Sequence, residues 1–225
     1  RIERIMSAVV IVNLGTGNLR SVRKAFEHVG ASEVLVSNDP HTIRNSGHLV
    51  LPGQGAIGTW MNQLEQDKSL AAAVSDRLQD GPVLGICLGL QALYRNSEEN
   101  GGTRCLGLLD GEVCHFAGVH GQLLDSQGPD ARRPKIPHMG WNQVWQEGGH
   151  PLWHGIEDGR RFYFVHSYYV ESASSADVVG WCVYGNRFVA AAARKNIFAT
   201  QFHPEKSQRD GLRLLENFLH WNGVH

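Results

Sequence analysis

The run Ala8–Leu14, Ala-Val-Val-Ile-Val-Asn-Leu, constrains the fold of this chain more than any other segment. It is almost continuously apolar and rich in β-branched residues. Such a run is typical of a strand that is buried on both faces. Strands of this kind occur in parallel sheets, because the crossover connections of a parallel sheet place helices over both of its faces. The segment therefore favours a parallel sheet covered by helices.

The first hundred residues alternate between strand and helix patterns. After the first strand, the glycine-containing segment 15–18 turns the chain, and apolar residues then recur at helical spacing from Leu19 until Gly30 ends the helix. The same reasoning predicts strands at Glu33–Ser37, His48–Leu51 and Pro82–Ile86, and a helix at Ser69–Leu78. We therefore expect an α/β fold of three layers, with a mostly parallel central sheet flanked by helices.

The second half of the chain has a different pattern. Gly118–Pro137, rich in Gly, Pro, Asp and Arg, predicts an exposed loop, and Arg209–Trp221 predicts a final helix. No linker or repeat interrupts the sequence, so we expect one domain over residues 7–225, with residues 1–6 as a cloning remnant or a disordered start. Short apolar runs that lie close together predict a partly antiparallel sheet, at Glu112–His115, Arg161–Val165, Val178–Val183, Val189–Ala193 and Ile197–Phe202.

Composition excludes several classes of function. Lys and Arg number 21 against 22 Asp and Glu, a formal net charge of -1, so the chain has no excess positive charge that would attract nucleic acid. No stretch of 18 consecutive apolar residues and no secretion signal occurs, so we expect a cytoplasmic protein that does not bind membranes. The four cysteines, Cys87, Cys105, Cys114 and Cys182, are too few for a disulfide framework. We expect reduced thiols, no metal site and no cofactor.

The clearest chemical signal surrounds Cys87. The segment Pro82–Gln91 combines a buried strand, the motif Gly-Ile-Cys-Leu-Gly and the start of a helix. This is the pattern of a nucleophile elbow, in which small neighbours permit a tight turn that exposes the reactive atom at the carboxyl edge of the sheet. The start of the following helix favours the thiolate. Taken alone, the motif is equally typical of a buried structural cysteine; the flanking strand and helix favour a nucleophile.

A candidate base follows another strand. The segment Phe198–Phe202 runs into His203-Pro204-Glu205. In an extended chain residues i and i+2 point to the same side, so we expect the carboxylate of Glu205 beside the imidazole of His203. Taken alone, His-Pro-Glu is more typical of an ordinary surface turn. With Cys87 elsewhere in the chain, it supplies the base and the orienting group that a cysteine nucleophile needs.

Two motifs together resemble the class I glutamine amidotransferases. They are Gly85–Gln91 and Gln201–Glu205, in the order Cys, His, Glu. Further motifs look like those of the glutaminase subunits of imidazole glycerol phosphate synthase, at Leu51–Ala56, Pro137–Asn142, Tyr163–Tyr168 and Lys206–Leu212. The resemblance extends from Val9 to Phe218 and implies a flavodoxin-like fold.

The resemblance implies a role for each matching residue. Cys87 attacks the side-chain amide of L-glutamine, His203 transfers the proton to the departing ammonia, and Glu205 holds the imidazole ring. Backbone N–H groups of Gln54 and Leu88 stabilise the oxyanion. Glutamine is bound by Gly53, Gly55, Gln91, Glu99, Ser167 and Tyr168, with Glu99 against the α-ammonium group.

The resemblance also implies a partner chain. Ammonia would pass to a (β/α)8-barrel cyclase subunit, which makes imidazole glycerol phosphate and aminoimidazole carboxamide ribotide in histidine biosynthesis. A barrel of that kind does not fit beside the amidotransferase motifs in 225 residues, so the two chains would form a heterodimer. By resemblance, Asn18, Trp141, Tyr163 and Lys206 face this partner.

Two positions depart from the expected patterns. Gln54 stands where the family most often has valine, and a polar side chain there would change how readily the peptide turns toward the oxyanion. Gly15–Arg20 resembles a phosphate-binding loop but lacks its third glycine, so we interpret it as a tight turn.

Three alternatives remain open at the level of sequence. A paralogous glutaminase subunit could serve a sugar-modifying synthase, and copurification with the natural partner would identify it. A cysteine hydrolase or peptidase could share the fold, although the His-Pro-Glu strand would then be unexpected. A binding protein without activity is the third, and the presence of Cys87, His203 and Glu205 argues against it.

Overall fold

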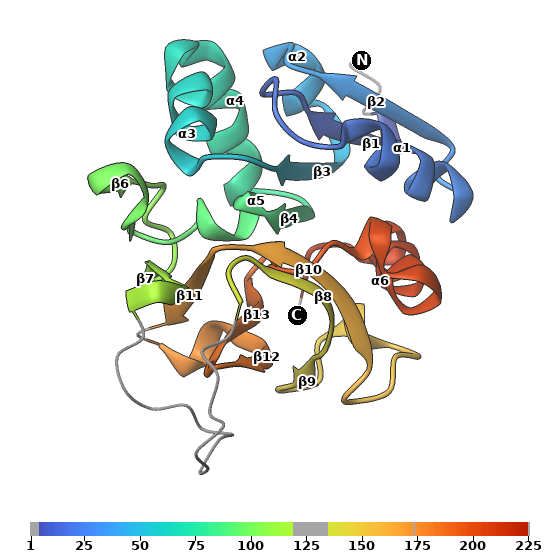
Figure 1. Cartoon of the computed structure of the whole chain (residues 1–225). Helices are drawn as coiled ribbons and strands as arrows, with labels where there is room; N and C mark the ends of the chain where they lie inside the picture. Colours follow the sequence, from blue (N-terminus) through green and yellow to red (C-terminus); the bar gives the residue numbers. More distant parts are fainter. Residues whose placement is uncertain (1–4, 119–134, 173, 225) are drawn as a thin grey trace, which may run out of the picture.

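One large sheet organises the molecule (Figure 1). A computed structural model describes residues 5–118, 135–172 and 174–224. Within these residues the sheet has eight strands, which follow one another in the order β2 (Glu33–Ser37), β1 (Ile5–Val12), β3 (Ser46–Gly53), β4 (Val83–Cys87), β14 (Ile197–Thr200), β13 (Asn186–Arg194), β12 (Val178–Tyr184) and β9 (Trp145–Gln146).

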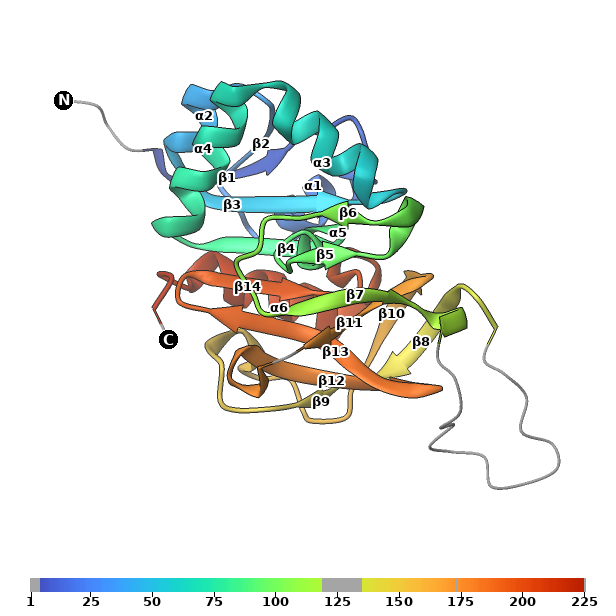
Figure 2. The same ribbon diagram turned by 90° about the vertical axis from the view of Figure 1, so that its left-hand side faces the viewer.

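The sheet is parallel in one half and antiparallel in the other. The strands from β2 to β14 pair in parallel, whereas β13, β12 and β9 pair antiparallel. Figure 2 shows β3, β4, β14, β13 and β12 stacked in this order. The order β2-β1-β3-β4-β14 is that of flavodoxin-like folds. The predicted α/β class, with a partly antiparallel second half, is confirmed.

Helices cover both faces of the sheet, which gives three layers (Figure 1). Neighbouring residues of β1 point to opposite faces: Val9 belongs to the core cluster that contains Phe26, whereas Val10 belongs to the cluster that contains Trp60. The helices of the first cluster are α1 (Leu19–His28) and α6 (Gln208–His220). Those of the second are α2 (Pro40–Arg44), α3 (Ile57–Gln66), α4 (Lys68–Gln79) and α5 (Leu88–Gln91).

Helix α3 is an element that was not predicted from the sequence. It begins at Ile57 without a side-chain cap, so the usual start signal is missing. Its apolar residues, Ile57, Trp60, Met61 and Leu64, are nevertheless buried at helical spacing. The indole Nε1 of Trp60 donates a hydrogen bond to the carbonyl of Pro52 at 3.0 Å, which ties α3 to the end of β3.

Two smaller sheets lie beside the large one. The first consists of β8 (His138–Gln143) and β10 (Arg161–His166), paired antiparallel. The second has the order β11 (Tyr168–Ser172), β7 (Gly111–His115), β5 (Asn96–Ser97) and β6 (Thr103–Arg104). Single turns of 3-10 helix connect the elements at η1 (Glu99–Gly101), η2 (Phe116–Gly118), η3 (Pro151–Trp153), η4 (Ser175–Asp177) and η5 (Pro204–Lys206). Of the predicted loop Gly118–Pro137, residues 119–134 lie outside the described part of the chain.

Strand β4 passes into helix α5 with no intervening residue. Cys87 is the last residue of the strand and the N-cap of the helix, with φ 56° and ψ -102°. The helix lies so close to β3 that a Cβ on Gly89 would be 1.9 Å from the carbonyl oxygen of Leu51. A Cβ on Gly85 would lie 2.9 Å from the backbone of Gly89 and from the Ala199 side chain. Close packing on both sides therefore holds this turn in place.

The β8–β10 ribbon is joined to the core by two buried histidines. His138 and His166 are paired in register, and His138 Nδ1 lies 2.9 Å from His166 Nε2. His166 Nδ1 lies 2.6 Å from the carbonyl oxygen of Tyr168. A carbonyl oxygen can only accept a hydrogen bond, so neutral His166 carries its proton on Nδ1. Its Nε2 must then accept a hydrogen bond from His138 Nδ1. The pair is therefore a directed chain of two neutral rings.

Burial keeps both histidines neutral. It lowers the pKa of His138 to about 4. Burial also lowers the pKa of His166 to about 3; the Tyr168 carbonyl opposes this change, and the positive charges of protonated His138 and His203 add to it. The ring of His138 also stacks on that of Tyr184, with centroids 3.9 Å apart.

Within the described residues, no helix is long and apolar enough to cross a membrane.

Replacement of Gly89 by Ala should destabilise the fold, because the added methyl group meets a backbone oxygen that cannot rotate away. We expect the free energy of unfolding to fall by about 3 kcal/mol or more, as for other overpacked positions. Chemical denaturation monitored by circular dichroism measures this. Gly149→Ala is the control, because a Cβ at this exposed glycine would meet no atom within 4 Å. Equal stability of the two variants would contradict the assigned packing.

Acid should weaken the fold through the histidine pair. The pKa of His138 is about 4 in the folded state, below the ordinary 6.5, so its contribution is complete above pH 6.5 and declines as pH falls toward 4. The full decline is about 3 kcal/mol for His138. His138→Asn does not titrate, so its unfolding free energy should depend less on pH in this range. His28→Asn, at an exposed histidine, should follow the wild type. Parallel curves for all three proteins would refute the idea.

Candidate active site

Three neighbouring strands end at the same edge of the sheet and bring the candidate residues together. Gly53 at the end of β3 is paired in register with Cys87 at the end of β4. On the other side of β4, Thr200 of β14 is paired with Ile86, so the chain after β14 passes beside Cys87. The carboxyl ends of parallel strands are the usual place for ligands in folds of this type.

Cys87 has the backbone geometry of a nucleophile elbow. A φ of 56° is uncommon for a residue with a Cβ and is found where the surrounding structure enforces it. The residue is 5% exposed and lines a cavity, so its side chain is reachable although it is nearly buried. The conformation predicted from Gly-x-Cys-x-Gly is therefore present.

His203 and Glu205 form the predicted pair, and the structure shows that both side chains are buried. Nδ1 of His203 lies 2.8 Å from Oε1 of Glu205, and both side chains are at most 2% exposed. The expected extended backbone is wrong, because β14 ends at Thr200 and Pro204–Lys206 is a 3-10 turn. The turn still places the carboxylate against the ring.

The backbone around His203 is fixed to strand β10. Its N–H donates to the carbonyl of Tyr163 at 2.9 Å, and its own carbonyl accepts from the Ser207 hydroxyl at 2.6 Å. The same hydroxyl accepts from the Tyr163 N–H at 3.0 Å. Tyr163 and Ser207 thus hold both sides of the His203 peptide.

The surroundings of His203 favour a protonated ring. Burial disfavours the charge, but the negative charge of Cys87 and hydrogen bonding to Cys87 and Glu205 outweigh burial and raise the pKa of His203 to about 10. The ring nitrogen Nε2 has no nitrogen or oxygen partner in the described residues, so it is available to the sulfur and to a ligand. His203 can therefore carry a proton on the nitrogen that faces the Cys87 sulfur.

A cavity of about 420 Å³ opens beside Cys87. Gly53 is absent from its lining and is packed instead against Leu88 and Trp60. Glu99 is held in place by the N–H of Ile57, which donates to Oε2 at 2.7 Å. Of the residues predicted to bind glutamine or its oxyanion, those that line the cavity are Gln54, Gly55, Leu88, Gln91, Glu99, Ser167 and Tyr168.

Three of the four predicted partner-facing residues lie together. The rings of Trp141 and Tyr163 meet edge to face, with centroids 6.1 Å apart, and Lys206 Nζ lies 6.0 Å from the Tyr163 ring. Lys206 also lines the cavity. Asn18 caps helix α1 through its side chain, and α1 packs against η5, which contains Lys206.

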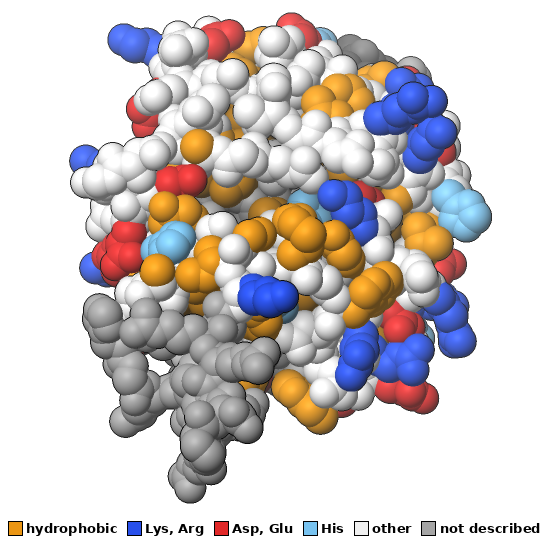
Figure 3. Space-filling view, in the orientation of Figure 1, with side chains coloured by type: hydrophobic (Ala, Val, Ile, Leu, Met, Phe, Trp, Pro, Cys, Tyr) orange, Lys and Arg blue, Asp and Glu red, His pale blue; other side chains and the backbone are white. Residues whose placement is uncertain are grey.

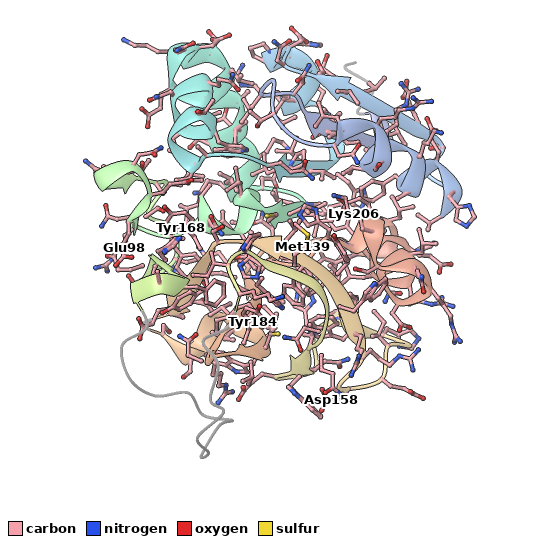
Figure 4. All side chains as sticks on the ribbon, viewed as in Figure 1. Glu98, Met139, Asp158, Tyr168, Tyr184 and Lys206 are labelled. Carbon is pink, nitrogen blue, oxygen red and sulfur yellow. The ribbon has the colours of Figure 1, made fainter. Side chains whose placement is uncertain are left out.

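Hydrophobic side chains gather across the face that carries these residues (Figure 3). Met139 is 62% exposed, and in the view of Figure 4 it lies between Tyr168 and Lys206. Trp141 is 42% exposed on the same strand. Alternation along β8 explains this, because residues 139 and 141 point outward while 138 points into the core.

Neither Gln201 nor the histidine pair was predicted from the sequence as part of the site. Gln201 is fully buried, and its Nε2 lies 3.7 Å from the sulfur of Cys87. Gln201 is the first residue of the Gln-Phe-His-Pro-Glu motif, and this position beside His203 is the sequence feature that could have identified it. His166 lines the cavity, and only the pairing of β8 with β10 reveals its partner.

No group of three or more His, Cys, Asp or Glu side chains in the described residues is placed to hold a metal ion.

Comparison with known proteins identifies close relatives. The chain matches the family model of glutamine amidotransferase class-I over residues 10–221. It is 50% identical over 219 residues to imidazole glycerol phosphate synthase subunit HisH 1 of Pseudomonas aeruginosa, covering 97% of this chain and 99% of that protein. It is also 50% identical over 217 residues to subunit HisH of Nitrosomonas europaea, covering 96% and 99%.

Solved structures show the same fold at low identity. A crystal structure of a glutamine amidotransferase is 18% identical with a TM-score of 0.65, covering 94% of this chain and 97% of that one. PurLQS from Thermotoga maritima is 18% identical with a TM-score of 0.68, covering 95% and 97%. On the family match and the sequence identities, the chain belongs to the class I glutamine amidotransferases and, within them, to the imidazole glycerol phosphate synthase subunit HisH proteins.

Proposed function

We propose that this chain is a glutaminase subunit, which hydrolyses L-glutamine to glutamate and ammonia for a separate (β/α)8-barrel cyclase in histidine biosynthesis. The cyclase would use the ammonia to make imidazole glycerol phosphate and aminoimidazole carboxamide ribotide. The observation that carries the proposal is Cys87 beside the buried His203–Glu205 pair at a cavity of about 420 Å³. The names of the relatives favour the histidine pathway over a sugar-modifying synthase.

In this proposal Cys87, His203 and Glu205 divide the chemistry. The Cys87 thiolate attacks the amide carbon of glutamine, and the tetrahedral intermediate expels ammonia as protonated His203 donates a proton to the departing nitrogen. This leaves a thioester. Water then attacks the thioester and gives its proton to His203, and the carbon–sulfur bond breaks to release glutamate and the thiolate. Glu205 holds the ring through Nδ1, so that Nε2 faces the reaction.

The oxyanion would be stabilised by backbone N–H groups from two sides of Cys87. One is that of Leu88, the residue after the nucleophile, which is the usual donor in an elbow of this kind. The other is that of Gln54, in the loop after Gly53, which is paired with Cys87 in register. Both residues line the cavity.

Glutamine itself would be bound by the polar lining of the cavity. Glu99 can pair with the α-ammonium group, since its Oε2 is fixed by the Ile57 N–H and the residue lines the cavity. Gln91, Ser167 and Tyr168 supply further polar groups. Gly53 would contribute through its backbone position next to Cys87 rather than by lining the cavity.

The cyclase would bind the apolar face that carries Met139 and Trp141. Exposed apolar area of this kind is typical of an interaction surface. Tyr163 and Lys206 border the same face, and Asn18 lies at the start of α1, which packs on η5. A contact between the cyclase and Tyr163 would directly affect His203, because the Tyr163 backbone holds the His203 peptide.

The decisive assay measures glutamate release by the complex of this chain with a cyclase, in the presence of the nucleotide ligand of the cyclase. We expect the wild type to be active in the complex and Cys87→Ala to be inactive, while synthesis from added ammonia persists in both. Cys105→Ala is the matched control, because Cys105 is similarly buried but does not line the cavity. Glutamate release by Cys87→Ala at the wild-type rate would overturn the nucleophile assignment.

Gln54 allows a test of the backbone donor. Gln54→Val keeps the N–H and should retain substantial activity and partner dependence. Gln54→Pro removes the N–H and should reduce kcat for glutamine hydrolysis by about 100- to 1,000-fold while sparing the ammonia-driven reaction. Since proline also changes the loop conformation, the two variants must be compared. If valine is as damaging as proline, the side chain of Gln54 rather than its backbone N–H is required for glutamine hydrolysis.

A further inference from the structure

We infer that Gln201 is a further catalytic residue, whose side-chain amide donates a hydrogen bond to the Cys87 sulfur from within the protein core. The inference rests on the proposed function, because it concerns the thiolate that attacks glutamine. Gln201 Nε2 lies 3.7 Å from Cys87 Sγ, within hydrogen-bonding distance for sulfur. Gln201 is fully buried and absent from the cavity lining, so it reaches the sulfur without facing the substrate cavity.

A main-chain carbonyl determines which end of the Gln201 amide faces the sulfur. The carbonyl oxygen of Tyr168 accepts a hydrogen bond from Gln91 Nε2 at 3.1 Å, so the nitrogen of Gln91 is on that side. The same nitrogen lies 3.1 Å from Gln201 Oε1. Since Gln91 donates there, Gln201 must present its oxygen to Gln91 and its NH₂ group to Cys87. The donor at the sulfur is therefore fixed by the network.

The same carbonyl is held from its other side. His166 Nδ1 lies 2.6 Å from Tyr168 O, and His138 Nδ1 donates in turn to His166 Nε2. Both lone pairs of the Tyr168 oxygen are thus used, one by Gln91 and one by His166. The arrangement leaves neither amide free to rotate without the loss of a buried hydrogen bond, which is costly.

A donor at this place serves both halves of the reaction. Cys87 is 5% exposed, so a thiolate formed there during the reaction loses most of its hydration, and a hydrogen bond to the charged sulfur compensates for that loss. In the second half, the carbon–sulfur bond breaks and its electron pair returns to the sulfur, which Gln201 stabilises again. The amide of Gln201 does not titrate, so its contribution persists while His203 gains and loses its proton.

The test uses Gln201→Met, which keeps the length of the side chain and removes the donor. The background carries Cys105→Ser and Cys114→Ser, and the remaining Cys182 is fully buried, so that iodoacetamide near neutral pH reports on Cys87. We expect alkylation of Cys87 and kcat/KM for glutamine in the complex each to fall by about 10- to 100-fold, the range for a hydrogen bond to a charged group. Thr200→Val is the matched control: it removes a fully buried hydroxyl that donates to Phe202 O instead of Cys87. It should leave the alkylation rate unchanged.

Unchanged alkylation and kcat/KM in folded Gln201→Met would overturn the inference, as would an equal loss in Thr200→Val. If Gln201→Met does not fold, Gln201→Asn tests the same point, because it keeps a buried amide but is one methylene shorter, which withdraws the NH₂ group from the sulfur. Wild-type alkylation in that variant would also overturn the inference. Failure of the proposed function is distinguishable: the wild-type complex would then release no glutamate, while alkylation of Cys87 would still depend on Gln201.

Discussion

At Cys87 the chain leaves a parallel strand and enters a helix within one residue, at a φ of 56° that a side chain ordinarily avoids. The turn persists because helix α5 is packed against β3 so closely that Gly89 has no room for a Cβ. Everything else in the site is placed relative to this turn. The β3 end lies on one side of it and the β14 end on the other, so one backbone constraint brings Gly53 and His203 to the same sulfur.

Side chains of the β8–β10 ribbon alternate between the molecular surface and the protein core. Its outward residues, Met139 and Trp141, form an apolar face, and its inward residues include the neutral pair His138 and His166. At its centre, the Tyr163 backbone holds the His203 peptide. A contact on the outside of the ribbon therefore touches strands that also hold the His203 peptide, through Tyr163, and line the cavity, through His166. In the proposed complex, partner binding at the outer face therefore affects the position of His203 through the strands of the ribbon.

Much of the fold could be predicted because it depends on local pattern. The β-branched run Ala8–Leu14 and the turns that follow predicted the parallel half, and Gly-x-Cys-x-Gly predicted the elbow. Helix α3 was missed because it lacks a capping residue, and the backbone at Glu205 was predicted as extended although it turns. The role inferred for Gln201 depends on contacts between residues 91, 168 and 201, and no local pattern encodes contacts at such separation.

The Tyr168 carbonyl, on which both arms of the polar network meet, belongs to the main chain. No side-chain substitution removes this carbonyl. Acceptance of the two hydrogen bonds therefore places no restriction on the residue type at position 168, whereas the network requires glutamine at positions 91 and 201. A scan of single substitutions would show a loss of activity at the two glutamines but would not identify the carbonyl oxygen that orients them. Chemical synthesis reaches that atom: an ester in place of the peptide bond between Tyr168 and Tyr169 would weaken the carbonyl as an acceptor without altering any side chain.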